Sequence, residues 1–205
     1  MDPITQAALA AGLAWGSGLR LYVVVFVAGL LQRLGYVTLP GDLALLSTDV
    51  VLWVSGGLLV GEFLADKVPV FDSVWDAIHT FIRVPGGMAL AGAAFGDYGA
   101  GTQVVAALLG GGITAGTHLT KTGTRAAINH SPEPFSNWIA SFAEDGMVLV
   151  GVWLAWQHPW VFLVLLILFL LLIAWLLPKL WRLLREAFRT LRRWFGTQSS
   201  PTPPH

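Results

Sequence analysis

Long apolar segments separated by short polar ones constrain this chain more than any other feature. A helix that spans a membrane needs about 20 predominantly apolar residues. Hydrophobic residues make up 55% of the 205 residues and charged residues only 12%, which is a membrane composition. Such segments cover about residues 4–31, 43–65, 84–100, 102–128, 135–156 and 159–177. We therefore predict an all-α polytopic membrane protein with about six transmembrane segments.

The chain divides by composition into a transmembrane domain, residues 1–178, and a basic end. Leucine, alanine and phenylalanine recur at helical spacing after Pro178, which predicts an amphipathic helix over 179–196 at the membrane surface. This helix holds six of the 12 Lys and Arg residues, and we expect it to bind anionic lipid through Lys179, Arg182, Arg185, Arg189, Arg192 and Arg193. The Pro-rich tail 197–205 is expected to be disordered.

The basic end also predicts the topology. Lys and Arg are enriched in cytoplasmic loops, so the helix after Pro178 is expected in the cytoplasm. An even number of spans then puts both termini on the cytoplasmic side. Arg33, near a loop expected outside, is the one dissenting cation.

Two pairs of similar segments indicate an internal repeat. AGLAWGSGL from Ala11 resembles GGITAGTHL from Gly111, and GGLLVGEFLADKVP from Gly56 resembles GMVLVGVWLAWQHP from Gly146. Three spans separate the copies, which predicts a three-plus-three inverted repeat, with one repeat over about 4–100 and the other over about 102–177. Chance similarity among segments rich in Gly, Ala and Leu is the alternative.

Charged residues at membrane depth are costly and are therefore usually kept for a site or for pairing. Arg20 lies near the middle of the first segment and needs an acidic partner. The symmetry of the predicted repeat would bring Arg20 close to polar groups of other segments. Of the adjacent carboxylates Glu144 and Asp145, we expect one to pair with a cation and the other to remain available for a ligand. The candidates for binding a solute or ion are Arg20, Glu62, His118, Lys121, Arg125, Glu144 and Asp145. Structural pairing, or an ordinary basic loop, is the alternative.

A second amphipathic helix is expected on the cytoplasmic side, between the second and third segments. Asp72, Asp76, His79 and Arg83 share one face of it. The first three are weak candidates for a divalent metal, and a polar network with Arg83 is the alternative. No cysteine and no catalytic motif is present, so we expect neither an enzyme nor a cofactor.

Two long motifs, ADKVPVFDSVWDAIHTFIRVPGG and KTGTRAAINHSPEPFSNWIASFAEDG, resemble a family of small bacterial membrane proteins catalogued as domain of unknown function 4126. The resemblance covers about residues 8–175. It implies a multi-pass protein of the bacterial inner membrane and supplies neither a substrate nor a reaction.

The sequence favours a transporter or channel for a small solute or ion, with a polar site between the repeats. The alternative is a non-transporting membrane organiser or lipid-handling protein that binds anionic lipid through the basic helix. A homo-oligomer is possible, and no feature predicts a nucleic-acid partner.

Overall fold

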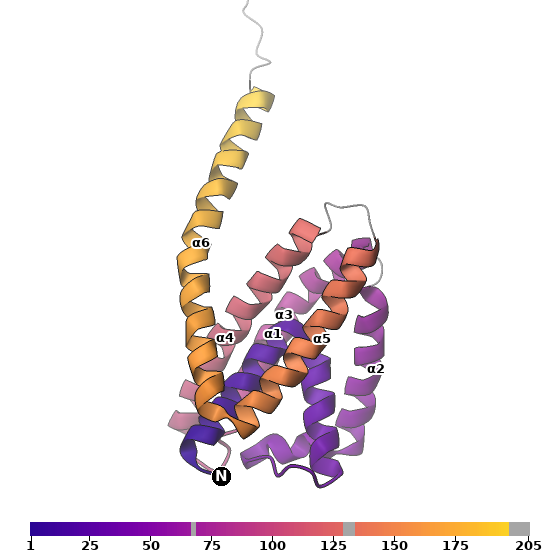
Figure 1. Ribbon diagram of the computed structural model, residues 1–205, viewed down its shortest axis with the longest axis vertical. Helices are drawn as coiled ribbons and strands as arrows, with labels where there is room; N and C mark the ends of the chain where they lie inside the picture. The colour runs from indigo at the N-terminus through magenta and orange to yellow at the C-terminus, as the bar shows by residue number, and fades with distance from the viewer. Residues whose placement is uncertain (67–68, 129–133, 197–205) are drawn as a thin grey trace, which may run out of the picture. The chain divides into compact units, whose positions relative to one another are not determined.

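The described part of the chain consists of helices and the turns that join them (Figure 1). The computed structural model describes residues 1–66, 69–128 and 134–196. It divides into two compact units, Met1–Leu166 and Ile167–His205. In chain order the elements are α1 (Pro3–Arg33), the 3-10 helix η1 (Gly41–Ser47), α2 (Asp49–Ala65), α3 (Pro69–Ala93), α4 (Ala100–Ile128), α5 (Pro134–Gln157) and α6 (Pro159–Gly196). The predicted all-α class is confirmed.

Fewer helices than predicted qualify as membrane spans by length and composition. Among the described residues, three candidates are Pro3–Arg33, Trp138–Gln157 and Pro159–Leu176. A fourth is the pair η1 and α2, which bends by 70° between its two helices. Helices α3 and α4 do not qualify. Both helices carry buried charged residues, namely Asp76, Arg83, Lys121 and Arg125. Apolar composition alone therefore does not identify every helix of this bundle as a membrane span.

Polar and apolar side chains are distributed inside out compared with a water-soluble protein. Charged residues such as Arg20, Glu62 and Arg83 are at most 1% exposed. Large apolar side chains cover the outside instead, including Trp53, which is 82% exposed. A water-soluble protein rarely exposes so much contiguous apolar surface and rarely buries so many charges. Together with the candidate spans, this distribution indicates a membrane protein.

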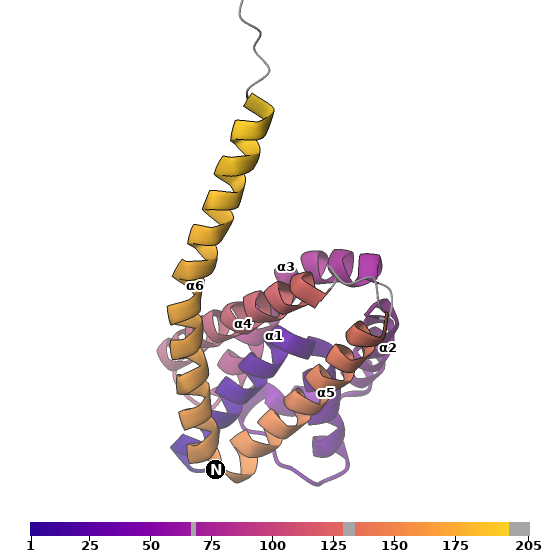
Figure 2. The same ribbon diagram turned by 45° about the horizontal axis from the view of Figure 1, so that its top comes forward.

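Helix α1 is folded into a hairpin rather than running straight across. Its backbone leaves helical geometry at Arg20, where φ is −145° and ψ is 78°. A β-carbon at Gly16 would lie 2.8 Å from the side chain of Val24. Residues eight apart in a straight helix are about 12 Å apart along the axis, so this contact requires the chain to turn back. Figures 1 and 2 show α1 rising from the N-terminus and then reversing.

Both ends of α1 therefore lie on one side of the first unit. Met1 and Gln6 line the same cavity, of about 900 Å³, as Tyr36 just beyond the end of α1. Asp2 caps the helix by accepting the N–H groups of Ile4 and Thr5, each at 3.0 Å. The Thr5 hydroxyl, and then these N–H groups, hold the pKa of Asp2 below its usual range. The predicted first span, residues 4–31, is instead a broken helix that returns to its starting side.

The hairpin is the centre of the first unit. Helices α2, α3, α4 and α5 all pack against α1, and most of α1 is buried. Glycine permits this close packing. A β-carbon at Gly12 would lie 2.6 Å from that of Ala155 on α5, and one at Gly18 would lie 2.6 Å from the carbonyl oxygen of Thr114 on α4.

Two predicted boundaries are absent. The amphipathic helix and the third apolar segment form one helix, α3, whose polar face at Asp76, His79 and Arg83 is buried rather than solvated. Helix α6 continues through Pro178, which was expected to end it. Proline removes one hydrogen bond from a helix but does not force it to stop, and membrane helices tolerate it.

The structure does not show an inverted repeat, and the first of the two similar pairs runs in one direction. Thr114 on α4 donates a hydrogen bond to the carbonyl of Ala14, its counterpart in the first copy, at 2.7 Å. Further along, Lys121 reaches the carbonyl of Leu19. The first half of α1 and α4 therefore run in the same direction, whereas inverted copies would run in opposite directions.

Candidate functional site

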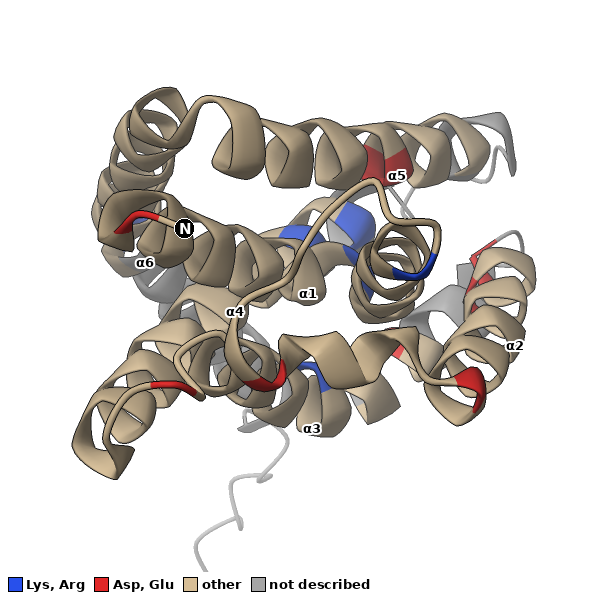
Figure 3. Cartoon of the chain, turned by 90° about the horizontal axis from the view of Figure 1, so that it is seen from below, with Lys and Arg blue, Asp and Glu red and all other residues tan. Residues whose placement is uncertain are grey.

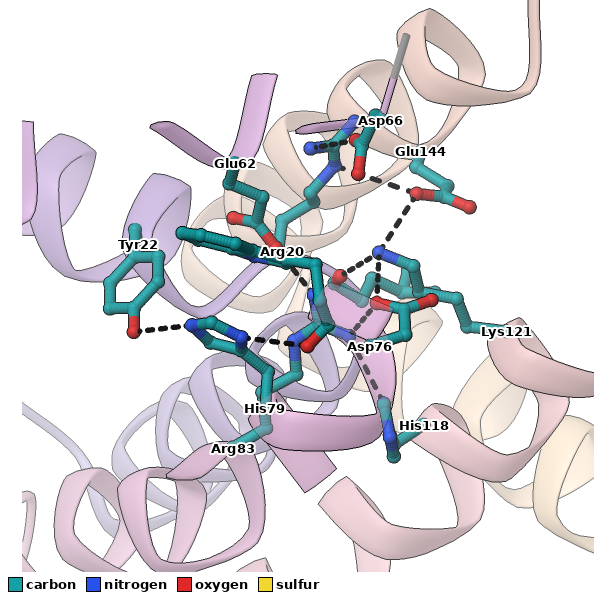
Figure 4. A network of polar contacts seen from close by, with 12 residues as sticks. Arg20, Tyr22, Glu62, Asp66, Asp76, His79, Arg83, His118, Lys121 and Glu144 are labelled. Atoms are coloured by element: carbon teal, nitrogen blue, oxygen red, sulfur yellow. Dashed lines mark hydrogen bonds and ion pairs between the residues drawn. The ribbon is translucent and has the colours of Figure 1, made fainter. Parts of the chain in front are cut away.

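A buried network of charged side chains surrounds the break in α1 (Figure 4). All of its members except Asp145 are at most 7% exposed as residues, and the side chain of Asp145 is 27% exposed. Five helices contribute to it, so the network ties α1 to α2, α3, α4 and α5. Within the described residues it comprises four cations, Arg20, Arg83, Lys121 and Arg125, and five carboxylates, Glu62, Asp66, Asp76, Glu144 and Asp145.

Lys121 compensates the broken backbone directly. The reversal at Arg20 prevents the carbonyls just before it from accepting the usual bonds of a continuous helix. The ammonium of Lys121 donates to one of them, the carbonyl of Leu19, at 3.0 Å. The C-terminal end of a helix carries partial negative charge, so a cation there is favourable.

Arg20, at the break itself, is shared among three carboxylates. Its guanidinium pairs with Asp66, at the end of α2, and its Nε lies 3.1 Å from Asp145 and 3.5 Å from Glu144 on α5. It also donates to the Ser141 hydroxyl at 2.5 Å, which donates to Asp66 at 3.2 Å. One arginine therefore fixes the end of α2 and the first half of α5 relative to the break.

Lys121 joins the two halves of the network. Figure 4 shows its ammonium between Asp76 and Glu144, at 3.4 and 3.3 Å. Glu144 also accepts from Nε and a terminal nitrogen of Arg125, at 2.8 and 3.0 Å. This two-point arrangement is the strongest common form of an ion pair. Glu144 is consequently well compensated.

Arg83 organises the other half. It donates to Glu62 at 2.5 Å and to Asp76 at 2.7 Å. It also donates to Nδ1 of His118 at 3.1 Å, so that nitrogen must accept and cannot carry a proton. Nε2 of His118 lies 2.7 Å from the Thr80 hydroxyl. His118 is therefore neutral in this arrangement.

His79 lies at the edge of this half and stacks on Trp75, with ring centroids 4.2 Å apart. Its Nδ1 lies 2.8 Å from the carbonyl of Trp75 and can only donate there. Its Nε2 lies 3.0 Å from the Tyr22 hydroxyl and can accept from it. The neutral imidazole satisfies both contacts, so neither contact requires His79 to be charged.

Several carboxylate oxygens remain without a hydrogen bond in this part of the structure. They are Oε2 of Glu62, Oδ1 of Asp66 and Oδ2 of Asp76, all within residues that are at most 3% exposed, and Oδ1 of Asp145. A buried acceptor without a partner is costly. The network can therefore accept a further positive species.

The seven residues predicted to bind a solute or ion all lie in or against this network: Arg20, Glu62, His118, Lys121, Arg125, Glu144 and Asp145. Asp66 was not predicted, although it follows Glu62 by four residues and so shares its helical face. Arg83 was predicted only as a possible structural partner of Asp76. The four-residue spacing from Glu62 could have identified Asp66 as a further member of the network.

The metal hypothesis finds no support among the described residues. No group of three or more His, Cys, Asp or Glu side chains there is arranged to hold a metal ion. Asp76 binds Arg83 and Lys121, and His79 binds Trp75 and Tyr22, which matches the alternative of a polar network. The side chain of Asp72 lies outside the described residues.

The predicted lipid-binding cations stay a prediction. The ammonium of Lys179 lies over the ring of Trp175, 3.1 Å from its centroid. Such a pair is common where a helix leaves the hydrocarbon. The side chains of Arg182, Arg185, Arg189, Arg192 and Arg193, and the tail 197–205, lie outside the described residues.

Comparison with known proteins places the chain in a family without a known role. The family described as "Domain of unknown function (DUF4126)" matches residues 7–179. The chain belongs to the DUF4126 family. The match covers the whole charged network of this DUF4126 protein and the first part of α6. The comparison with curated proteins found no match, and neither did the comparison with solved structures.

Proposed function

We propose that this DUF4126 protein is a transporter or channel for a small solute or ion, and that the buried network around Arg20 is its site. The observation that carries the proposal is the break in α1 at the centre of this network. Broken helices at membrane depth occur where irregular backbone is buried in protein or lines a pathway. In transporters, such breaks form substrate and ion sites near the midplane.

The burial of nine charges also supports a site over a structural role. Ion pairs in a low-dielectric interior often stabilise a fold no better than apolar residues of similar volume. If the charged residues served only to make the fold rigid, apolar packing could replace them, such as the packing of Gly12 of α1 against Ala155. Intramembrane charges are usually retained where they bind or move something.

We further propose a membrane arrangement in the bacterial inner membrane. Helices α3 and α4, at 25 and 29 residues, are long enough to cross a hydrocarbon layer of about 30 Å. With α2, α5 and the first part of α6 they give five crossings. Helix α1 enters and leaves on one side as a re-entrant hairpin. The inverted repeat is not part of this arrangement, because the first half of α1 and α4 run in the same direction.

The test uses the purified protein in proteoliposomes. Ion currents are measured on a supported membrane, and uptake of small neutral solutes is measured by stopped-flow light scattering. We expect permeability above that of empty vesicles for at least one solute or ion, and loss of that permeability in Glu144→Gln and Arg20→Ala. Arg33→Ala, which removes an exposed pair on the same helix, is the matched control and should keep it.

Thermal unfolding in detergent, measured beside the flux, separates chemistry from folding. Loss of flux with a folded protein supports the site. If the folded wild-type protein moves nothing in either assay, the transport proposal is wrong, and a membrane organiser that handles lipid becomes the better description.

A further inference from the structure

The charges of the network do not balance. Among the described residues, four cations face five carboxylates, and the two histidines that touch them, His79 and His118, make contacts that the neutral imidazoles satisfy. An uncompensated charge in a low-dielectric interior is strongly unfavourable, and a group placed there usually neutralises instead. In the part of the network that the structure describes, full ionisation therefore leaves one negative charge in excess.

The imbalance can be located. Around Arg83, two cations meet two carboxylates, since Lys121 with Arg83 faces Glu62 and Asp76. Around Arg20, two cations meet three carboxylates, since Arg20 with Arg125 faces Asp66, Glu144 and Asp145. Lys121 lies between the halves, 3.3 Å from Glu144 and 3.4 Å from Asp76, so it serves both. The half at the break of α1 therefore holds three carboxylates for two cations of its own and a share of Lys121.

Asp145 is the least compensated of these three carboxylates. Glu144 is held at two points by Arg125, and Asp66 accepts from Arg20 and Ser141. Asp145 has one described ionic partner, Nε of Arg20, which is shared with the others. Its side chain is 27% exposed, whereas those of Glu144 and Asp66 are 9% and 0% exposed. Water can therefore reach Asp145 more readily than it reaches the rest of the network.

We propose that a proton compensates this excess negative charge, and that Asp145 binds and releases it during the transport cycle. A proton from water adds to a carboxylate oxygen of Asp145 and leaves a neutral carboxyl group, with no other bond broken. The described part of the network is then balanced. The inference rests on the proposed transport function, because it makes the proton the coupling or transported ion of the same site.

A proton fits the site better than a metal cation. No group of three acidic or histidine side chains in the described part of the chain is arranged around a common point. The oxygens without a hydrogen bond on Glu62 and Asp66, at the end of α2, and on Asp76, on α3, belong to carboxylates that each already pair with a guanidinium or ammonium. A proton needs one oxygen and no coordination shell.

Protonation of Asp145 would act on the break in α1 through Arg20. Loss of the negative charge removes one of the three carboxylates that Arg20 serves and leaves Asp66 and Glu144 as its partners. Arg20 is the residue at which the backbone of α1 reverses. A change in the ion pairs of Arg20 therefore acts directly on the turn of the hairpin. This gives a direct physical route from proton binding to movement of the hairpin.

Other charged and titratable groups close to Asp145 influence its titration. Charged or titratable residues face the site from every element packed around it: Arg20 from α1, Glu62 and Asp66 from the end of α2, Asp76, His79 and Arg83 from α3, His118, Lys121 and Arg125 from α4, and Glu144 from α5.

The test is infrared difference spectroscopy of the full chain in lipid, with aspartate labelled with carbon-13, between alkaline and acidic buffer. We expect a protonated-carboxyl band that is present in the wild type, absent in Asp145→Asn, and retained in Asp49→Asn, which changes an exposed carboxylate near the other end of α1. Should Asp145→Asn fail to fold, Asp145→Glu keeps a carboxyl group and should shift the band to the unlabelled frequency.

A second readout is the melting temperature in lipid nanodiscs across pH. A folded state that binds more protons than the unfolded state loses stability as pH rises. The melting temperature of the wild type should therefore fall with rising pH, and the fall should be smaller in Asp145→Asn. If both proteins show the same band and the same pH dependence, the inference is wrong.

A melting temperature that follows sodium or potassium concentration instead of pH would replace the proton with a metal cation and overturn the inference. Transport without titration of Asp145 would refute the proton but leave the transport function standing. Titration of Asp145 in a protein that moves no solute or ion would refute the transport function, and with it the coupling role.

Discussion

Gly18 makes the crossing of α1 and α4 possible, and this crossing holds the break in place. A β-carbon there would meet the carbonyl oxygen of Thr114 and the side chain of Thr117, each at 2.6 Å. A backbone carbonyl cannot rotate away as a side chain can. The helices would have to separate, which would also draw Lys121 away from the carbonyl of Leu19.

Gly18→Ala is therefore expected to destabilise the protein by about 1–3 kcal/mol, the usual cost of an overpacked interior. The measurement is thermal unfolding in detergent. Gly112→Ala is the control, because a β-carbon at that position of α4 meets nothing within 4 Å. It should be neutral or slightly stabilising, since alanine favours a helix over glycine by up to about 1 kcal/mol. Equal losses in both variants would show that the crossing is not tight.

Arg20→Ala should be far more damaging than the loss of another arginine on the same helix. It leaves Asp66, which is fully buried, and Asp145 without their closest cation, and breaking a buried pair in this way costs about 3–5 kcal/mol. Arg33→Ala removes a pair whose side chains are 47% and 72% exposed, which is worth about 0–1 kcal/mol. Unfolding by denaturant measures both. Similar losses would contradict the central position of Arg20.

The sequence predicted most members of the network because charge in an apolar segment is conspicuous. Arg20, Glu144 and Asp145 interrupt apolar sequence and could be selected on energetic grounds alone. Asp66 and Arg83 lie where apolar sequence gives way to polar sequence, and such residues usually lie at a membrane surface. Only the course of α3 reveals that this polar boundary is folded into the bundle.

At the scale of helices, the reversal of α1 could not be predicted from periodicity. Apolar residues satisfy a straight span and a folded hairpin equally well, since both bury the same side chains. The glycines at 16 and 18 permit an interruption of the helix, but they do not fix its angle. Helices α4 and α5, in contrast, begin and end within two residues of the predicted segments, because turns or polar sequence bound them clearly.

The hairpin makes a direct prediction for labelling. The chain has no cysteine, so single cysteines can be introduced at Ile4 and at Tyr36, which are 37% and 76% exposed near the two ends of α1. A maleimide that does not cross membranes should label both from the same side of sealed vesicles. A cysteine at Thr124, near the far end of α4, should be labelled from the other side. Labelling of Ile4 and Tyr36 from opposite sides would mean that α1 spans the membrane.

Removal of residues 179–205 should leave the first unit folded, because the contacts of the network all lie before residue 167. It should weaken binding of anionic lipid by about 1 kcal/mol for each cation removed near the surface. Native mass spectrometry in detergent, with anionic lipid added, measures the difference. Removal of 197–205 alone, which contains no Lys or Arg, is the matched control and should change nothing. Unfolding of the longer truncation would show that the basic helix supports the bundle.

For the whole molecule, the charges outside the network indicate how it lies in the membrane. The described residues on the side of Asp2 are mainly acidic, and Figure 3 shows acidic segments around this face. Asp97 accepts from the backbone of Gly41 there, and Arg33 pairs with Asp49. Cytoplasmic surfaces are enriched in Lys and Arg. This face is therefore expected to be periplasmic.

The two termini are consequently expected on opposite sides, and not both in the cytoplasm as an even number of spans would require. Helix α1 returns to the side of Asp2, and the proposed arrangement has five crossings after it. An odd number carries Lys179 and the basic segment after it into the cytoplasm, where the sequence placed them. A reporter fused after His205 should be active only in its cytoplasmic form, and a cysteine at Ile4 should react with impermeant reagent added to intact cells. A cytoplasmic Ile4 together with a cytoplasmic His205 would require six crossings, and the hairpin would then have to open in the membrane.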